Sequence, residues 1–291
     1  MILIAGANGF LGSEVCNKLK KKKIKFLRLD ISLKGIEKVD INNINNLEKL
    51  FIKHKIKTII NCACEPATSK SKNEIIKTNK KGNLNLIKLA LKYKVNKFIF
   101  FSTSAIFVKN YTKPLNENAK PNPVETYGLS KVLAEKDIIK SNLKSWTIFR
   151  IPMIVSKKRL GVLSILFDFI INNKKIPILN EGNNFLQFIH IDDLTNFIIR
   201  SINIQEKEIF NLASDEILTL KNLFLKLINS IDSRSKIIQF KDIGITPFLS
   251  FFLSRHREGE RGINLWESFG ESKKGTQRVC VNWSSVRSKY K

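Results

Sequence analysis

The stretch MILIAGANGFLG, residues 1–12, opens with a short apolar run and continues with three glycines. Gly6, Gly9 and Gly12 are spaced Gly-x-x-Gly-x-x-Gly between a predicted strand over 2–5 and a predicted helix. Glycines in that setting permit a tight turn, a close approach of the backbone to a pyrophosphate, and close packing of helix on strand. A plain glycine-rich turn also satisfies the spacing, so a dinucleotide site must be supported by the residues that follow.

Apolar runs alternate with helical periods through the first 150 residues, which is typical of strand–helix units around a parallel sheet. The runs are rich in Ile and Phe without polar alternation, as expected for strands covered on both faces. We therefore predict an α/β fold: a Rossmann-type, doubly wound parallel sheet with a small C-terminal substrate lobe. The predicted strands are 2–5, 24–29, 57–62, 97–102 and 145–151, and the predicted helices are about 10–22, 45–54, 73–93 and 125–141.

The pattern is less regular after Pro152, and the last part of the chain changes in composition. Residues 254–291 hold five of the ten Arg, two of the three Trp and a single Ile, so we treat them as an anomalous tail of unknown role. Further helices are predicted near 161–172, 193–202 and 219–231, and a strand over 188–191. The expected division is a dinucleotide-binding domain over 1–155, to which 185–215 returns, and a substrate lobe made of 156–184 and 216–253.

The net charge of +26 raises the question of a nucleic-acid partner. Of the 51 basic residues 41 are Lys and are spread along the chain, whereas nucleic-acid readers rely on Arg and interleaved aromatic side chains. The one dense run, Lys18 and Lys20–Lys23, falls at the end of a predicted helix, where cations suit the helix dipole. We expect no nucleic-acid partner, although a basic surface attracts anionic substrates such as nucleotide sugars.

Cysteines and apolar segments bear on the cellular compartment. Cys62-x-Cys64 lies in a predicted buried strand with no second pair, so no zinc or other metal site is expected. With Cys16 and Cys280 they are interpreted as reduced core residues. No signal segment precedes the first strand, and the apolar run 247–253 is too short to span a bilayer. We expect a cytoplasmic protein without a membrane span.

Asp30 stands at the end of the second predicted strand, eighteen positions after Gly12. A carboxylate there accepts hydrogen bonds from the adenosine ribose hydroxyls and repels a 2′-phosphate, which favours NAD over NADP. Arg28 points the same way in the strand and moderates that preference. Asp30 also fits a loop residue at a strand end. Asp40-Ile41 is expected to flank the adenine, and it also fits a polar loop.

Tyr127 and Lys131 lie four residues apart, on the same face of a predicted helix. A nearby positive charge favours a phenolate, so we expect Lys131, together with an oxidised nicotinamide, to lower the pKa of Tyr127 enough for it to act as a base. Ser102-Thr103-Ser104 ends the fourth predicted strand, at the edge where open α/β sheets bind ligands. One of these hydroxyls is a candidate to polarise a substrate carbonyl. In isolation, Tyr127 and Lys131 also fit an exposed helix face, and the three hydroxyls also fit the end of a strand.

With these residues in place, the chain resembles the extended short-chain dehydrogenase/reductase family, in its NAD-dependent epimerase/dehydratase branch. The matching motifs occur in family order and cover roughly residues 1–220. They are Gly6-x-x-Gly9-x-x-Gly12, Asp30, Asp40-Ile41, Asn61-Cys-Ala63, Thr78-Asn79, Ser102-Thr-Ser-Ala105, Tyr127-x-x-x-Lys131 and Phe188-Ile-His-Ile-Asp-Asp193.

The resemblance implies hydride transfer between a sugar carbon of a nucleotide sugar and NAD. Tyr127 would exchange the hydroxyl proton, Lys131 would hold the cofactor ribose, and Thr103, with Ser104 as second choice, would be the catalytic hydroxyl. A homodimer through two long helices is also implied. The residues that the resemblance assigns to the cofactor are Gly6, Asn8, Gly9, Phe10, Leu11, Gly12, Asp30, Asp40, Ile41, Cys62, Ala63, Asn79 and Lys131.

Some positions depart from the family pattern and leave the substrate open. Met153 replaces a frequent Asn, Leu186 replaces an Arg that binds the diphosphate in many members, and Val108 replaces a common Gly. The Ser-Thr-x-x-Ile-Phe pattern is similar to dTDP-4-dehydrorhamnose reductases, which do not typically carry the motif over 188–193. The alternatives are therefore an NAD(P)H-dependent 4-keto nucleotide-sugar reductase and a non-catalytic, cofactor-binding regulator.

Three polar residues of the later motif are expected to be structural. We interpret His190 as a hydrogen-bonding strand residue between the lobes, Asp192 as a helix N-cap and Asp193 as a first-turn acid. All three are excluded from the catalytic set.

Overall fold

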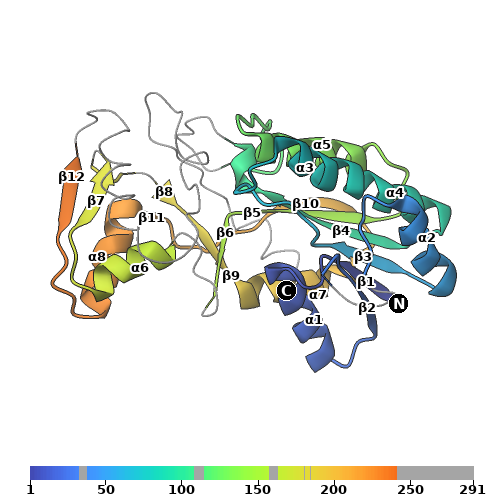
Figure 1. The fold of residues 1–291 in the computed structure, drawn as a ribbon, viewed down its shortest axis with the longest axis horizontal. Helices are drawn as coiled ribbons and strands as arrows, with labels where there is room; N and C mark the ends of the chain where they lie inside the picture. Colours follow the sequence, from blue (N-terminus) through green and yellow to red (C-terminus); the bar gives the residue numbers. More distant parts are fainter. Residues whose placement is uncertain (33–37, 108–114, 157–162, 180, 184, 241–291) are drawn as a thin grey trace.

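A six-stranded, all-parallel sheet forms the centre of the computed structural model (Figure 1). The structure describes residues 1–32, 38–107, 115–156, 163–179, 181–183 and 185–240. The strands lie in the order β10-β5-β4-β3-β1-β2. Their bounds are β1 Ile2–Ala5, β2 Phe26–Leu29, β3 Thr58–Asn61, β4 Lys97–Thr103, β5 Trp146–Ile151 and β10 Lys207–Asn211.

Helices cover both faces of this sheet (Figure 1). One face packs against α1 (Phe10–Lys21) and α7 (Ile191–Ser201), which also contact each other. The other face packs against α2 (Ile44–Lys53), α4 (Asn83–Lys92) and α5 (Thr126–Ile139). This two-sided cover is why the strands are continuously apolar, and the predicted fold class is confirmed.

The strand order places a topological switch point at β1. In register, Ala5 pairs with Leu29 of β2 on one side and with Asn61 of β3 on the other. Following the chain, β2 is added on one side of β1, and β3, β4, β5 and β10 are then added on the other side. Ligands of open α/β sheets bind beyond the carboxyl ends of the strands at such a point.

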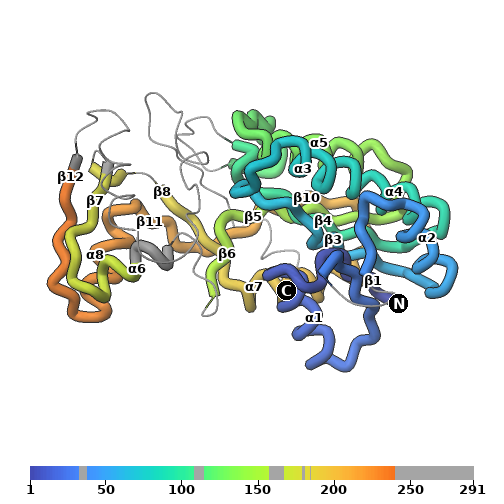
Figure 2. Tube along the Cα trace, viewed as in Figure 1, coloured from blue at the N-terminus to red at the C-terminus, as the bar shows by residue number. Residues whose placement is uncertain are grey.

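A smaller group of elements lies at one end of the sheet (Figure 1). Its apolar cluster includes Phe169, Ile176 and Phe224. Figure 2 shows the chain leaving the sheet after β5 and returning to it through β9, α7 and β10. The elements of this end are α6 Leu163–Ile171, β7 Ile176–Leu179, β8 Phe185–Leu186, β11 Leu218–Thr219, α8 Leu220–Ser230 and β12 Ile237–Phe240. The paired strands β6 Met153–Val155 and β9 Phe188–His190 join this end to the sheet, and Ile189 of β9 lies in the core of the sheet. The expected lobe boundaries stay a prediction, and the tail lies outside the described residues.

The predicted helix over 73–93 is not continuous. It consists of α3 (Lys72–Ile76), a π-helical turn over Lys77–Gly82 and then α4. Within the part of the chain that the structure describes, a short 3₁₀ turn also follows β4, at Ser104–Ile106. Both irregular turns lie near residues that the sequence assigns to chemistry, and π-helical turns are frequent at functional sites.

Two interpretations of single residues are wrong. The N-cap of α7 is His190 rather than Asp192, because its Nδ1 accepts a hydrogen bond from the Asp192 N–H at 3.3 Å; Asp192 and Asp193 both lie in the first turn. The cysteines do not all lie in the core: Cys16 is buried, Cys62 is half-buried and Cys64 is exposed. No helix among the described residues is long and apolar enough to cross a membrane.

Candidate active site

The turn after β1 has no room for side chains at two of its glycines. Gly6 has a φ of +75°, and a Cβ there would lie 2.5 Å from the backbone N of Ala63. A Cβ on Gly12 would lie 2.0 Å from the carbonyl oxygen of Gly6. Glycine is therefore required at both positions, by backbone conformation and contact at the first and by contact alone at the second.

The N-terminus of α1 is open to an anionic ligand. Its N-cap is the exposed Gly9, no side chain caps the helix, and no acidic residue lies in the first turn. Phe10 and Leu11 in that turn are half-buried. The backbone N–H groups at the start of a helix and the positive end of the helix dipole fit the pyrophosphate of a dinucleotide.

Asp30 sits beside this turn, in a polar cluster with Asn8, Arg28 and Ser32. Its Oδ2 accepts a hydrogen bond from the Asn8 backbone N at 3.0 Å, and its Oδ1 accepts from Ser32 N at 2.9 Å and Ser32 Oγ at 2.7 Å. Arg28 donates to Asn8 Oδ1 at 2.6 Å. The carboxylate is thus fixed at the end of β2, next to the glycine turn.

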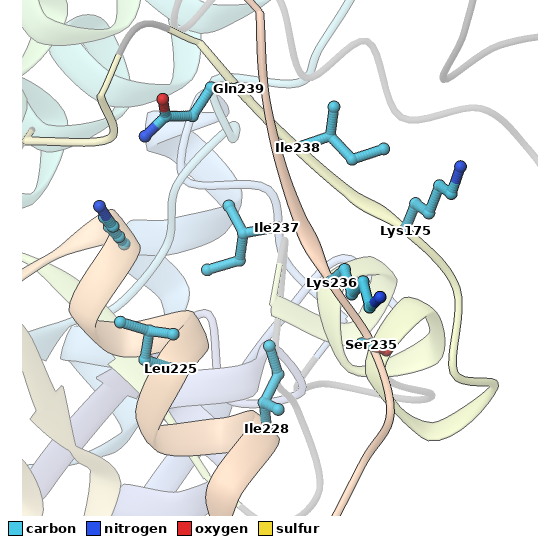
Figure 3. Close-up of a pocket in the computed structure, with 9 residues that line it drawn as sticks. Lys175, Leu225, Ile228, Ser235, Lys236, Ile237, Ile238 and Gln239 are labelled. Atoms are coloured by element: carbon cyan, nitrogen blue, oxygen red, sulfur yellow. The ribbon is translucent and has the colours of Figure 1, made fainter.

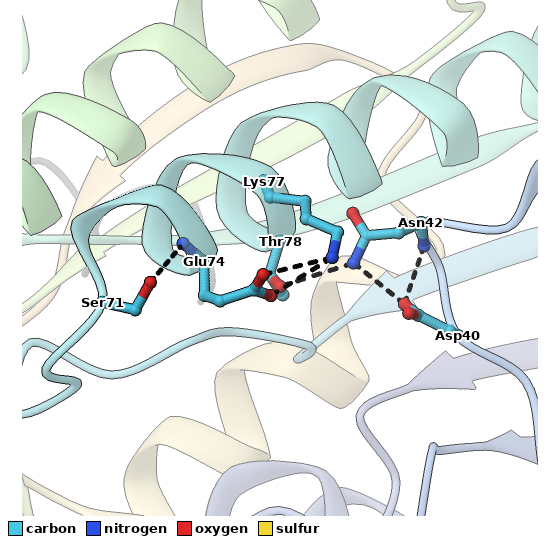
Figure 4. Close-up of polar contacts among 6 residues, drawn as sticks. All are labelled: Asp40, Asn42, Ser71, Glu74, Lys77 and Thr78. Atoms are coloured by element: carbon cyan, nitrogen blue, oxygen red, sulfur yellow. Dashed lines mark hydrogen bonds and ion pairs between the residues drawn. The ribbon is translucent and has the colours of Figure 1, made fainter.

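The loop after this cluster holds Asp40 and Ile41 in different environments. Asp40 is exposed, and its Oδ1 accepts from Asn42 N at 2.8 Å and Asn42 Nδ2 at 2.9 Å. Asn42 Nδ2 lies 3.4 Å from Thr78 Oγ1, so the loop is joined to the π-helical turn (Figure 4). Ile41 is buried, and a Cβ on Gly82 would lie 2.6 Å from its Cδ1.

Tyr127 and Lys131 lie at the start of α5. Lys131 is 4% exposed; its Nζ donates to the Phe101 carbonyl at 3.0 Å and lies 5.7 Å from the centre of the Tyr127 ring. Burial raises the pKa of Tyr127 well above its ordinary value, and Cys64, whose Sγ is 3.9 Å from the phenol oxygen, raises it further. The expected lowering of the Tyr127 pKa depends on the oxidised nicotinamide as well as on Lys131, so it stays a prediction for the protein with cofactor bound.

The hydroxyls at the end of β4 have distinct partners. Thr103 Oγ1 caps the 3₁₀ turn by accepting from Ala105 N at 3.1 Å, which leaves its own proton available to donate. Ser102 is 2% exposed, and its Oγ has no hydrogen-bond partner among the described residues. Ser104 is half-buried. Of the two predicted candidates, Thr103 therefore has a hydroxyl oxygen that is held in place by the Ala105 N–H and a hydroxyl proton that can still be donated to a ligand.

Asn79 is buried in the π-helical turn and does not point its amide to solvent. Its Oδ1 accepts from Glu65 N at 2.8 Å, and its Nδ2 donates to Glu65 O at 3.0 Å and Ser130 Oγ at 3.1 Å. Ser130 Oγ donates to the Tyr127 carbonyl at 2.7 Å. The sequence predicts no role for Ser130 or Cys64, although Ser130 stands three residues after Tyr127.

A cavity of about 840 Å³ lies elsewhere, in the smaller group of elements (Figure 3). Leu225, Ile228 and Ile237 line its apolar part, and Lys175 and Lys236 lie at its margin. The residues predicted for the cofactor and for proton transfer are absent from its lining. The described part of the chain therefore places the candidate chemistry at the carboxyl edge of the sheet, apart from this cavity.

The model of the NAD-dependent epimerase/dehydratase family matches residues 2–213. A putative UDP-glucose 4-epimerase of Methanocaldococcus jannaschii is 26% identical over 97% of this chain and 98% of its own length. A dTDP-4-dehydro-6-deoxyglucose reductase of Escherichia coli is 27% identical over 83% of this chain and 84% of its own length. The chain spans only 61% of the length of an uncharacterized protein of Sinorhizobium fredii, to which it is 26% identical.

Among solved structures, the UDP-glucose 4-epimerase of Thermotoga maritima with UDP-glucose superposes with a TM-score of 0.75. The match covers 99% of this chain and 91% of that one at 20% identity, so it supports the fold. Together with the family match, which spans all six strands of the sheet, it accounts for the strand order. The chain belongs to the NAD-dependent epimerase/dehydratase family.

Proposed function

We propose that this protein catalyses an NAD-dependent epimerisation or dehydration that begins with oxidation of a sugar carbon in a nucleotide sugar. The observation that carries the proposal is the placement of Tyr127 and Lys131 beside the end of β4, where Thr103 offers a hydroxyl, at the same sheet edge as the glycine turn. A phenol, an ammonium and a hydroxyl together suit proton transfer at a sugar oxygen.

The residues present fit NAD. The glycine turn and the uncapped start of α1 would hold its pyrophosphate, and Asp30 would accept from an adenosine ribose hydroxyl. Lys131, fixed by the Phe101 carbonyl, would hold the other ribose. When bound, NAD would supply a hydride acceptor and donor for the sugar carbon.

Tyr127 and its neighbours would transfer the proton to and from the sugar oxygen. Because burial raises its pKa, Tyr127 is protonated at neutral pH without cofactor and is ready to donate to a sugar carbonyl oxygen. The oxidising direction needs the phenolate as the base for the sugar hydroxyl proton, and the positive charges of Lys131 and of a bound oxidised nicotinamide would lower the pKa of Tyr127 so that this phenolate forms. Thr103 would donate its free proton to the same sugar oxygen.

The test compares Tyr127→Phe with wild type. Native mass spectrometry first identifies any retained dinucleotide, and the protein is then incubated with a panel of nucleoside-diphosphate sugars. We expect Tyr127→Phe to abolish turnover and to keep the NAD affinity of wild type. The matched control is Tyr93→Phe, because Tyr93 lies at the end of α4 and bonds Glu48. Full turnover by Tyr127→Phe would overturn the assignment.

A reductase is the second candidate, because the chain matches the E. coli reductase over most of both lengths and carries Ser102-Thr-x-x-Ile-Phe107. A reductase consumes one NADH or NADPH for each 4-keto sugar, whereas an epimerase shows no net consumption. Absorbance of the reduced nicotinamide therefore separates the two. Retained NAD with no turnover on any sugar of the panel would instead support the non-catalytic regulator.

A further inference from the structure

The hydroxyl of Tyr127 has one hydrogen-bond partner among the described residues, and that partner is a thiol. Cys64 Sγ lies 3.9 Å from the phenol oxygen. The Lys131 ammonium lies over the ring instead, 5.7 Å from its centre, and donates to the Phe101 carbonyl. The polar contact of the phenol oxygen is therefore made by the sulfur of Cys64 and not by the ammonium.

The proton of this thiol has a closer acceptor than the phenol. Cys64 Sγ lies 3.3 Å from the carbonyl oxygen of Glu65. A thiol carries one proton, so a Cys64 that donates to the carbonyl offers only its sulfur to Tyr127. In that arrangement the phenol is the donor and the sulfur is the acceptor. Because sulfur is a weak acceptor, this hydrogen bond is easily exchanged for one to an oxygen.

Cys64 lies between the glycine turn and Tyr127. The residue before it, Ala63, packs directly on the turn: a Cβ on Gly6 would lie 2.5 Å from the Ala63 backbone N. Cys64 itself is exposed, so a ligand can reach its sulfur. A ligand that extends from the glycine turn to the Tyr127 hydroxyl therefore comes close to this thiol.

We propose that Cys64 is a positioning residue for the reaction: its sulfur holds the Tyr127 hydroxyl before the sugar binds, and the reacting oxygen of the sugar then replaces the sulfur at that hydroxyl. The inference rests on the proposed role of Tyr127. No covalent bond changes in the exchange, since the phenol proton turns from sulfur to the sugar oxygen and the thiol keeps its own proton. The sugar oxygen is the stronger acceptor, so the exchange favours the complex.

The titratable groups around the phenol make this contact measurable. Burial is the main cause of the raised pKa of Tyr127, and Cys64 raises it further through its charge and hydrogen bond. Lys131 faces the ring from the same helix, and Glu65 meets the thiol through its backbone carbonyl. Cys62 lies near Cys64 and Lys131, and burial raises the pKa of its thiol, which is therefore uncharged at neutral pH. Removing the Cys64 thiol lowers the pKa of Tyr127 and leaves these other groups in place.

The first readout needs no turnover. The phenolate absorbance of the full-length protein is titrated with pH, and the titration of the same protein with Tyr127→Phe is subtracted, so that only Tyr127 contributes. We expect a lower pKa of Tyr127 in Cys64→Ala and in Cys64→Ser than in wild type. Serine keeps the shape of the side chain and a donor for the Glu65 carbonyl, without an ionisable thiol. Cys16→Ala is the matched control, because Cys16 is buried in α1.

The second readout is the pH dependence of kcat/KM, which reports the enzyme before the sugar binds. In the oxidising direction a base is required, so kcat/KM rises with pH. We expect this rise to move to lower pH in both Cys64 variants and to stay in place in Cys16→Ala. At saturating sugar the contact is already exchanged, so kcat should change less than about threefold. A purely structural role would change stability without moving the rise.

The third readout follows the exchange itself. Cys64 is alkylated with iodoacetamide in the protein with NAD, and its peptide is followed by mass spectrometry. The rate is measured alone, with UDP-glucose and with each other nucleoside-diphosphate sugar of the panel. We expect a sugar that is turned over to slow the alkylation severalfold, because its reacting oxygen lies where the thiol met Tyr127.

Each outcome has a definite meaning. An unchanged titration of Tyr127 in both Cys64 variants would overturn the inference. A shift in Cys64→Ala that Cys64→Ser does not share would also overturn it, since lost volume and not the thiol would be the cause. The same holds if a sugar that is turned over leaves the alkylation rate unchanged. If no sugar were turned over, the proposed function would fail, while the titration would still decide whether Cys64 holds the hydroxyl.

Discussion

Asp30 binds its own loop and still has capacity for a ligand. Three donors reach the carboxylate, from Asn8 and Ser32. A carboxylate offers about four acceptor positions, so room remains for a ribose hydroxyl. The negative charge at this place disfavours a 2′-phosphate.

We predict that Asp30→Asn reduces the preference for NAD over NADP by about tenfold or more, since a hydrogen bond to a charged group contributes about 1.5–3 kcal/mol. Arg28, at 2.6 Å from Asn8, would then face a 2′-phosphate without an opposing charge. Titration of intrinsic fluorescence with NADH and NADPH measures both affinities. Asp168→Asn, in α6, is the control, and an unchanged NAD/NADP ratio in Asp30→Asn would contradict the assignment.

Single residues can be predicted from the sequence where the backbone conformation or a close backbone contact requires them. Gly6 and Gly12 follow from the turn that they permit, and both are required in the structure. The contact of Cys64 with Tyr127 was not predictable, because the two are far apart in sequence and a thiol carries no motif. The sequence predicts a strand position for His190, and the structure also gives it the capping role that the sequence favours for Asp192.

At the scale of an element, the junction of β1 and α1 depends on the closeness of two backbones. A Cβ on Gly12 would lie 2.0 Å from Gly6 O, whereas one on Gly9 would lie 3.2 Å from the same oxygen. We predict that Gly12→Ala lowers the free energy of unfolding by about 1–3 kcal/mol or more through overpacking, and weakens NAD binding. Urea unfolding of Gly12→Ala and Gly9→Ala tests this, and equal losses in the two variants would be inconsistent with it.

A buried ion pair ties α5 to β5. Arg150 donates three hydrogen bonds to Glu135, the shortest at 2.7 Å, and a fourth to the Glu117 carbonyl. Removing one partner leaves a buried charge, so Glu135→Ala should cost about 3–5 kcal/mol of unfolding free energy. The half-exposed pair of Lys77 and Glu74 is the control, and Glu74→Ala should cost no more than about 1 kcal/mol. Similar losses in the two variants, measured in urea, would argue against a structural role for the pair.

Elements were predictable where the hydrophobic period is long and were missed where it is short. The five strands of the first half and the helices α1, α2 and α5 lie within a few residues of the prediction. The strands β7, β10 and β12 were not predicted, because four or five residues between polar segments give little pattern. The π-helical turn has no hydrophobic signature of its own, and its place depends on the long-range contact of Asn79 with Glu65.

At the scale of the whole molecule, the carboxyl and amino edges of the sheet carry different kinds of residue. The carboxyl edge carries the glycine turn, Asp30 and Thr103, while the amino edge holds a buried lysine. Lys97 begins β4, is 1% exposed, and donates from Nζ to Ser145 Oγ at 2.9 Å and to Glu206 O at 3.3 Å. It joins the start of β4 to the segments that enter β5 and β10, away from the candidate site.

Burial lowers the pKa of Lys97 to about 8, against the opposing attraction of Glu206 and Glu208. The unfolded chain keeps this proton up to the ordinary value of 10.5, so between about pH 8 and 10.5 it binds more protons at Lys97 than the folded chain does. The contribution of Lys97 to the free energy of unfolding therefore rises with pH across that window, and below it the full cost of burying the ammonium is present.

We predict that Lys97→Met removes this rise, because the methionine buries a similar chain without a charge. The difference in unfolding free energy between variant and wild type should change by about 1–3 kcal/mol from pH 7.5 to 10.5, in the direction that favours wild type at high pH. Urea unfolding across that range measures it, and Lys88→Met, at an exposed position of α4, should follow wild type in parallel. A Lys97→Met curve that also ran parallel would mean that the ammonium is solvated in the folded chain. Turnover at the opposite edge should be unchanged in both variants, since neither side chain reaches Tyr127 or the glycine turn.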